Sequence, residues 1–194
     1  MSDRGILIVV SAPSGCGKTS VLARLMQMRT TLHFSVSATT RKPREGEKDG
    51  IHYMFITRDV FEWMIRENAF LEYAEYVGNY YGTPRAAVEQ QLRSGQDVYL
   101  DIEVNGAMQV KSKCPDALTV FLMPPSMEEL ERRLTFRGTE APEVVQKRLR
   151  EAERECSQRD KYDYIVVNDE IDRAAEEISR LIDETRARLS AGTV

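Results

Sequence analysis

Residues 11–20, SAPSGCGKTS, combine small, cationic and hydroxyl side chains at the spacing of a phosphate-binding loop. Gly15 and Gly17 lack a Cβ atom, so their backbone can take positive φ angles and approach an anion closely. Lys18 can reach the β- and γ-phosphates of a nucleoside triphosphate, and the hydroxyl of Thr19 can ligate Mg²⁺. The pattern therefore predicts that this loop holds nucleotide phosphates.

The loop departs from the common pattern at its first position, where Ala12 stands in place of a glycine. Ala12 precedes Pro13, which favours extended backbone at residue 12, and alanine adopts that conformation without strain. The apolar run GILIVV comes before the loop, as a buried strand would, and apolar residues at helical spacing follow it. The alternative is a glycine-rich turn that contains GKT by chance.

A second group of side chains suited to an anion lies in the segment SATTRKPREGEKDGIHYMF. Arg41 and Arg44 are three residues apart, and two guanidinium groups can bind one phosphate in a forked geometry. Two phenol hydroxyls could donate to the same anion, those of Tyr53 and Tyr81. The alternative is a solvated basic turn neutralised by two neighbours, Glu45 and Glu47.

Glu72 lies in the alternating stretch FLEYAEY, which predicts a strand. On a strand it shares a face with Phe70 and Ala74, and a carboxylate among apolar groups needs a partner or a ligand. Glu75 would lie on the opposite face and make the better surface charge. The alternative for Glu72 is also a surface charge, on an edge strand.

Two carboxylates end the apolar stretch YLDIE at residues 99–103. Ligands of open α/β sheets bind at the carboxyl ends of the strands, so Asp101 suits the task of holding Mg²⁺ or its waters. Glu103 lies two residues further on, in the same direction. The alternative is an acid at a helix N-terminus, favoured there by the helix dipole.

Three arginines flank a break at residues 137–143, RGTEAPE, which predicts a hinge or the tip of a lid. Arg133 and Arg137 are four residues apart on a predicted helix, and Arg148 lies on the next one. They could close over a phosphate during its transfer. The alternative is a solvated face, because neighbouring glutamates allow ion pairs at helical spacing.

These residues need a scaffold of alternating strands and helices. Apolar runs predict strands near residues 5–10, 34–37, 97–102, 118–122 and 163–167. Amphipathic periodicity predicts helices near residues 18–28, 84–94, 104–112, 126–136, 141–160 and 171–190. The alternation indicates an α/β fold with a parallel sheet covered on both faces. Residues 38–83 break it and predict a small, mostly β insertion with a short helix near 58–68.

Composition excludes several functions. The 194 residues are 42% hydrophobic and carry a formal net charge of −4, so no general basic surface indicates a nucleic acid polymer or a membrane as partner. The three cysteines are widely spaced and predict neither a disulfide framework nor a zinc site. With no signal peptide visible, we expect a cytoplasmic protein. The sequence leaves a homo-oligomer open.

Six segments of the chain, taken in order, closely resemble the guanylate kinase family: SAPSGCGKTS, SVSATTRKPREGEKDGIHYMF, FLEYAEYVGNYYGT, LDIEVNGA, RGTEAPEVVQKRL and YIVVND. The similarity covers essentially the whole chain. It implies an α/β fold in which residues 1–37 and 84–194 form a P-loop kinase core with a parallel five-stranded sheet. Residues 38–83 would be an inserted, mostly β GMP-binding lobe, and residues 126–160 or so a helical lid.

The resemblance also implies a role for each matching residue. The ATP-binding positions are Ala12, Pro13, Ser14, Gly15, Cys16, Gly17, Lys18, Thr19, Arg137 and Asn168. The GMP-binding positions are Ser37, Arg41, Arg44, Tyr53, Glu72, Tyr81, Thr83, Asp101 and Glu103. The positions expected to act in catalysis are Lys18, Arg44, Arg133, Arg137 and Arg148. Mg²⁺ would be held by Thr19 and by Asp101, directly or through a water.

The reaction implied is ATP + GMP ⇌ ADP + GDP with Mg²⁺, and dGMP is a further candidate acceptor. An ionised Glu72 would accept hydrogen bonds from guanine N1 and N2, and the hydroxyls of Ser37 and Thr83 would donate to O6. Besides Ala12, two residues depart from the family pattern: Glu170 replaces an aspartate, and Phe136 replaces a small residue in the lid. Two rival functions remain, a ribose bisphosphate kinase and a module that binds phosphopeptides through the GMP lobe.

Overall fold

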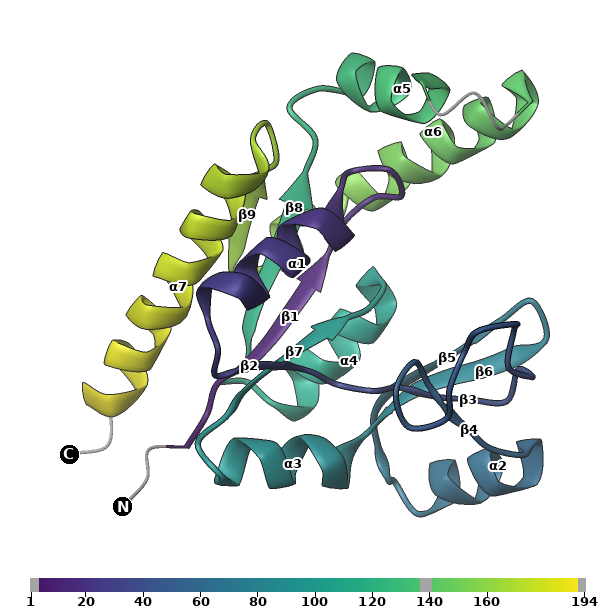
Figure 1. Cartoon of the computed structure of the whole chain (residues 1–194), viewed down its shortest axis with the longest axis vertical. Coiled ribbons are helices and arrows are strands. Elements are labelled where there is room, and N and C mark those ends of the chain that lie inside the picture. Colours follow the sequence, from purple (N-terminus) through teal and green to yellow (C-terminus); the bar gives the residue numbers. More distant parts are fainter. Residues whose placement is uncertain (1–3, 137–140, 192–194) are drawn as a thin grey trace.

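The apolar run before the phosphate loop forms β1 (Leu7–Ser11), the central strand of a five-stranded sheet. The structure is a computed structural model that describes residues 4–136 and 141–191 (Figure 1). The strand order is β2-β7-β1-β8-β9, and every pairing is parallel, as predicted. The other strands are β2 (Leu32–Phe34), β7 (Asp97–Asp101), β8 (Leu118–Met123) and β9 (Tyr164–Val167).

Helices cover both faces of this sheet, which explains why β1 is apolar at every position before Ser11. Ile8 and Val10 are buried on the face that packs against α1 (Lys18–Met28) and α7 (Ile171–Ala191). Leu7 and Val9 are buried on the opposite face, against α3 (Arg85–Arg93) and α4 (Val104–Lys113). Figure 1 shows α1 and α7 together on one side of the strands. The sheet therefore holds the loop after β1 between two packed layers.

Two further helices lie beyond the carboxyl ends of the central strands (Figure 1). These are α5 (Met127–Phe136) and α6 (Pro142–Cys156), in the segment predicted as the lid. They pack on each other through a small apolar cluster of their own, made of Leu130, Leu134, Val145 and Ala152. This pair therefore reaches over the end of the sheet where the phosphate loop lies.

A second sheet occupies the segment predicted to break the α/β alternation. Its strand order is β4-β3-β6-β5, and β5 (Phe70–Tyr76) and β6 (Asn79–Pro84) form an antiparallel hairpin. The short strands are β3 (Ala38–Thr39) and β4 (Met54–Phe55), and α2 (Arg58–Arg66) packs Phe61 against Phe70. This sheet carries the residues proposed above to bind an acceptor.

Two predicted boundaries were wrong. The strand expected at residues 34–37 lies earlier, at Leu32–Phe34, because buried Leu32 packs in the core beside α1 and the chain then crosses to the second sheet. The helix expected at 141–160 ends at Cys156 and is followed by a 3₁₀ turn (Arg159–Lys161). Within the described ranges, 4–136 and 141–191, no helix is long and apolar enough to cross a membrane.

Candidate functional site

The loop between β1 and α1 has the backbone of an anion cradle. Gly15 and Gly17 have φ angles of 89° and 91°, a region that residues with a Cβ atom rarely adopt. Space also requires glycine here, because a Cβ atom on Gly17 would lie 2.7 Å from the side-chain nitrogen of Asn168. Ala12 is not among the described non-glycine residues with positive φ, so its substitution for glycine is unstrained, as predicted.

Lys18 and Asp101 meet at the carboxyl end of the sheet. Lys18 is the first residue of α1, Asp101 is the last of β7, and β7 is paired directly with β1. Their side chains form an ion pair that is partly open to solvent. The lysine is thus held in place beside the loop by a carboxylate that a phosphate group would have to replace or share.

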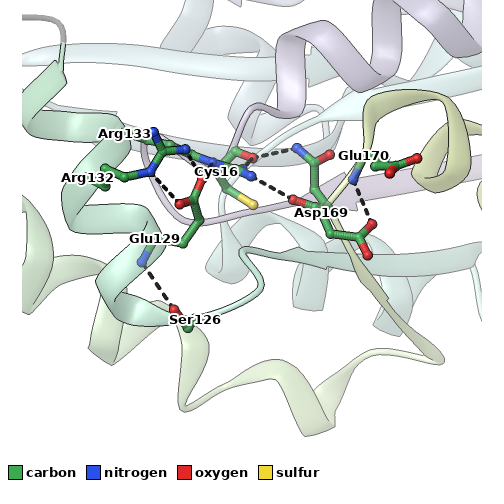
Figure 2. A network of polar contacts seen from close by, with 8 residues as sticks. Cys16, Ser126, Glu129, Arg132, Arg133, Asp169 and Glu170 are labelled. Carbon is green, nitrogen blue, oxygen red and sulfur yellow. Dashed lines mark hydrogen bonds and ion pairs between the residues drawn. The ribbon is translucent and has the colours of Figure 1, made fainter.

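A polar network braces the loop from behind (Figure 2). The Asn168 side chain is buried and its amide donates to the Cys16 carbonyl at 2.7 Å. Arg133 donates to the same carbonyl at 3.2 Å, to the Asn168 carbonyl at 3.1 Å and to Glu129 at 2.8 Å. Hydrogen bonds from Arg132 and Arg133 lower the pKa of Glu129 to about 2. The solvated-face alternative therefore does not describe Arg133 fully, because its guanidinium holds the loop in place as well as pairing with Glu129 one helical turn earlier.

Cys16 lies at the centre of this network but has no reactive thiol. It is fully buried, its Sγ lies 3.5 Å from the Leu122 carbonyl, and burial raises the pKa of its thiol to about 12. A thiol with that pKa is protonated at neutral pH and is a poor nucleophile. Cys16 thus contributes its backbone, and not its thiol, to the loop.

The helix α6 reaches the loop through two residues, one predicted and one not. Arg148 donates to the Ser14 hydroxyl at 2.6 Å. Glu155 was missed by sequence reasoning: burial raises the pKa of its carboxyl, and a hydrogen bond from the backbone of Ser14 in the loop partly offsets this. Its Oε2 is buried without a hydrogen-bond partner among the described residues. Arg137 lies outside the described residues. Phe136 is 87% exposed, so its ring packs little against the described residues.

An open cleft of about 840 Å³ lies on the other side of the loop. It is lined by residues of the loop, of α5 and of the start of α7, among them Gly17, Arg133, Asn168 and Ile171. The cleft continues from the glycines that would hold phosphates, so it has the size and place for the remainder of a nucleotide.

The second sheet buries Glu72, so the surface-charge alternative is wrong. Glu72 is 6% exposed and Thr83 is fully buried beside it, on the neighbouring strand. The Thr83 hydroxyl donates to Glu72 Oε1 at 2.6 Å, so in this structure its proton is directed at the carboxylate, and its donation to guanine O6 stays a prediction. Burial raises the pKa of Glu72, and the hydrogen bond from Thr83 partly offsets this. Glu75 is an exposed charge, as predicted, and lies 3.8 Å from Arg58.

Three of the four predicted phosphate ligands gather on this sheet. The Arg41 guanidinium lies 5.4 Å from the centre of the Tyr53 ring, and the Tyr53 and Tyr81 rings are 6.0 Å apart. Arg41 also binds both oxygens of Glu47 at 2.9 Å, so the neutralised-turn alternative holds for this residue. Hydrogen bonding to Arg41 lowers the pKa of Glu47 to about 2.

Arg44 differs from Arg41. Its backbone N–H donates to Glu47 at 2.7 Å, whereas its guanidinium is exposed and has no hydrogen bond or ion pair within residues 4–136 and 141–191. Ser37 lies half-buried directly before β3, and its carbonyl accepts a hydrogen bond from Met54 at 2.9 Å. Arg44 therefore lies in the inserted segment that contains the second sheet and Ser37 lies directly before it, and the Arg44 guanidinium is not engaged in an ion pair among the described residues.

Comparisons with known proteins agree with this geometry. A family model described as guanylate kinase matches residues 4–185. A guanylate kinase of Lactococcus lactis is 52% identical over 97% of this chain and 92% of its own length, and one of Thermus thermophilus is 50% identical over 95% and 84%. The crystal structure of guanylate kinase from Anaplasma phagocytophilum superposes with a TM-score of 0.74 at 33% identity, covering 95% of this chain and 87% of that one. The chain belongs to the guanylate kinase family.

Proposed function

We propose that this protein transfers a phosphoryl group from ATP to GMP, giving ADP and GDP. The observation that carries the choice of acceptor is the buried Glu72–Thr83 pair. An ionised carboxylate only accepts hydrogen bonds, which suits the N1–H and N2 amine of guanine and repels the unprotonated N1 of adenine. Family membership supports the same reaction.

The donor would occupy the loop and the adjoining cleft. The N–H groups around Gly15 and Gly17 and the ammonium of Lys18 favour its phosphates, and the cleft beside Asn168 has room for the adenosine. Arg133 and Arg148 already contact the loop at Cys16 and Ser14, a position from which guanidinium groups stabilise the charge of a transferring phosphate. We extend this role to Arg137 on the resemblance alone.

The acceptor phosphate would bind among the side chains around Arg41. Arg44 has a guanidinium with no partner among the described residues, and Tyr53 and Tyr81 offer phenol hydroxyls. Ser37 would donate to guanine O6, while Asp101 and Glu103 would lie between the two substrates. No general base is needed, because a phosphomonoester with a second pKa near 6 arrives with an anionic oxygen ready to attack.

Magnesium fits the residues present. Thr19 supplies a hydroxyl at the start of α1, and Asp101 a carboxylate at the end of β7, the hard oxygen donors that Mg²⁺ prefers alongside waters and phosphate oxygens. We propose that these two residues hold the ion, Asp101 directly or through a water. When bound, it would neutralise charge on the phosphates of ATP.

We further propose that residues 38–83 act as the GMP lobe and residues 126–160 or so as the lid over a core of residues 1–37 and 84–194. Closure of the lobe and lid would exclude water, the competing acceptor. The cysteines described, Cys16, Cys114 and Cys156, are all free, which supports a reducing compartment such as the cytoplasm.

The two rival functions fit less well. A ribose bisphosphate kinase has no use for a buried carboxylate that faces a base, and a phosphopeptide-binding module has no use for the Lys18–Asp101 pair at a complete phosphate loop.

One assay tests the proposal against both rivals. ADP formation from ATP and Mg²⁺ is measured with GMP, dGMP, AMP, CMP, UMP and ribose 1,5-bisphosphate as acceptors. We expect turnover with GMP and at most weak turnover with AMP, and Lys18→Ala should lower kcat at least about 10²–10³-fold. Absence of GMP-dependent ADP formation by the parent protein would refute the proposal.

A further inference from the structure

Helix α4 covers the free edge of the strand that carries Glu72. In the second sheet β5 is an edge strand, so one side of its backbone lacks a strand partner. Gln109 accepts from the Tyr73 N–H at 3.2 Å and donates to the Tyr73 carbonyl at 3.0 Å, and Lys113 donates to the Phe70 carbonyl at 3.1 Å. These side chains of α4 satisfy the edge as a neighbouring strand would.

Gly106 completes the same face of α4, because residues 106, 109 and 113 follow helical spacing. A Cβ atom built on Gly106 would lie 2.8 Å from Glu72 Oε2, 3.4 Å from its Cδ and 3.5 Å from its Cγ. These three atoms are the nearest ones outside the helix backbone, and all belong to one side chain. The space that a methyl group would fill is therefore the space that the Glu72 carboxylate occupies.

The backbone at this position does not call for glycine. Gly106 lies inside a helix and does not have a positive φ, so alanine would adopt the same conformation and favour the helix more. The atom in conflict is the end of a flexible side chain, which can swing aside without disturbing the core. Local stability thus argues for alanine, and only the placement of the carboxylate argues for glycine.

We propose that Gly106 is a positioning residue for guanine selection, acting through Glu72; this rests on the proposed reading of guanine by that carboxylate. Thr83 holds Oε1 at 2.6 Å, and the bare backbone of Gly106 leaves room for Oε2. A methyl group would push Oε2 away by about 0.6 Å or more, from 2.8 Å to the 3.4 Å of ordinary contact. Since Oε1 is tethered, the carboxylate must rotate or lose its bond to Thr83.

The variant Gly106→Ala tests this, with Ser112→Ala as the matched control at the exposed far end of the same helix. Misplaced hydrogen bonds to a charged group should lower kcat/KM for GMP roughly ten- to hundredfold. The KM for ATP should stay within about twofold, and the Tm should stay near that of the parent if the carboxylate rotates and fall modestly if its bond to Thr83 breaks. Ser112→Ala should match the parent in all three measurements. A kcat/KM for GMP within twofold of the parent would overturn the inference.

A second comparison separates positioning from general damage. In a Glu72→Ala background the methyl group meets no carboxylate, so adding Gly106→Ala should change kcat/KM for GMP and the Tm little. If Gly106→Ala lowered kcat/KM for GMP by the same factor in the Glu72→Ala background as in the parent, Gly106 would not act through Glu72, and the inference would be overturned. This failure differs from failure of the proposed function, in which the parent protein itself does not phosphorylate GMP.

Discussion

Replacing Glu72 by glutamine removes a charge without changing the size of the side chain. The Thr83 hydroxyl donates to Oε1, so the new amide would keep its oxygen there and place its NH₂ group where Oε2 now lies. That NH₂ group would face the N1–H and N2 amine of guanine, which are donors themselves. At least one charge-assisted hydrogen bond is lost, and a buried donor is left without an acceptor.

The substitution should lower activity without lowering stability. A hydrogen bond to a charged group contributes about 1.5–3 kcal/mol and an unpaired buried donor costs about 1–3 kcal/mol, so kcat/KM for GMP should fall roughly a hundredfold or more. Burial raises the pKa of Glu72, which means that above the pKa of the unfolded chain its ionised form disfavours folding. Glu72→Gln removes that cost, so its Tm at pH 7 should equal or exceed that of the parent.

Steady-state ADP formation with GMP and with AMP at saturating ATP, together with thermal unfolding at pH 7, measures both effects. The ratio of kcat/KM for GMP to kcat/KM for AMP should decrease in the glutamine variant, because guanine binds more weakly and the repulsion of adenine N1 is relieved. An unchanged ratio, with GMP turnover near that of the parent, would mean that Glu72 does not read the base.

Other predictions follow from particular contacts. Thr83→Ala removes a hydrogen bond that lowers the pKa of Glu72, so the acidic limb of kcat/KM for GMP should move to higher pH than in the parent; the pKa of GMP is common to both, and superimposable profiles would contradict this. Arg44→Lys replaces a fork by a point charge, so calorimetry should show weaker binding of GMP and unchanged binding of ATP, whereas equal losses would count against the role of Arg44. Asp97 is fully buried and accepts from the Ile6 N–H at 2.9 Å and from Arg186, so Asp97→Ala should cost about 3–5 kcal/mol in urea unfolding; a cost below about 1 kcal/mol would refute the importance of this pair.

The parts of the site that follow a backbone rule could be predicted from the sequence. Two glycines before a lysine at a strand-to-helix junction dictate the phosphate loop, and the carboxyl end of a central parallel strand places Asp101 beside it. The structure confirms the glycine backbone of the loop and the place of Asp101 beside Lys18, while the binding of phosphate and metal there stays a prediction. The five-stranded sheet follows from the same alternation of apolar runs and amphipathic helices.

The parts that depend on tertiary packing could not be predicted. The alternating pattern of residue types did not decide whether Glu72 is buried. In the structure β5 begins with three successive buried residues beside a register shift, and Phe70 and Leu71 belong to different apolar clusters. The partner of Glu72 lies eleven residues away on the next strand, and Gly106 lies on a helix of the other sheet. Glu155 looks like any acid on an amphipathic helix until its contact with the phosphate loop is known.

The ion pair between Arg41 and Glu47 would make the proposed acceptor lobe selective against free anions. Glu47 is a tethered counter-ion that already binds the Arg41 guanidinium through both oxygens, so an anion from solution has to displace it. An anion that binds nothing else would have to displace this carboxylate unaided, whereas the phosphate of GMP, on the proposed function, would be brought to Arg41 by a base bound on the same sheet. Exchange of Glu47 for a phosphate would then be favourable only when the phosphate is attached to the right base.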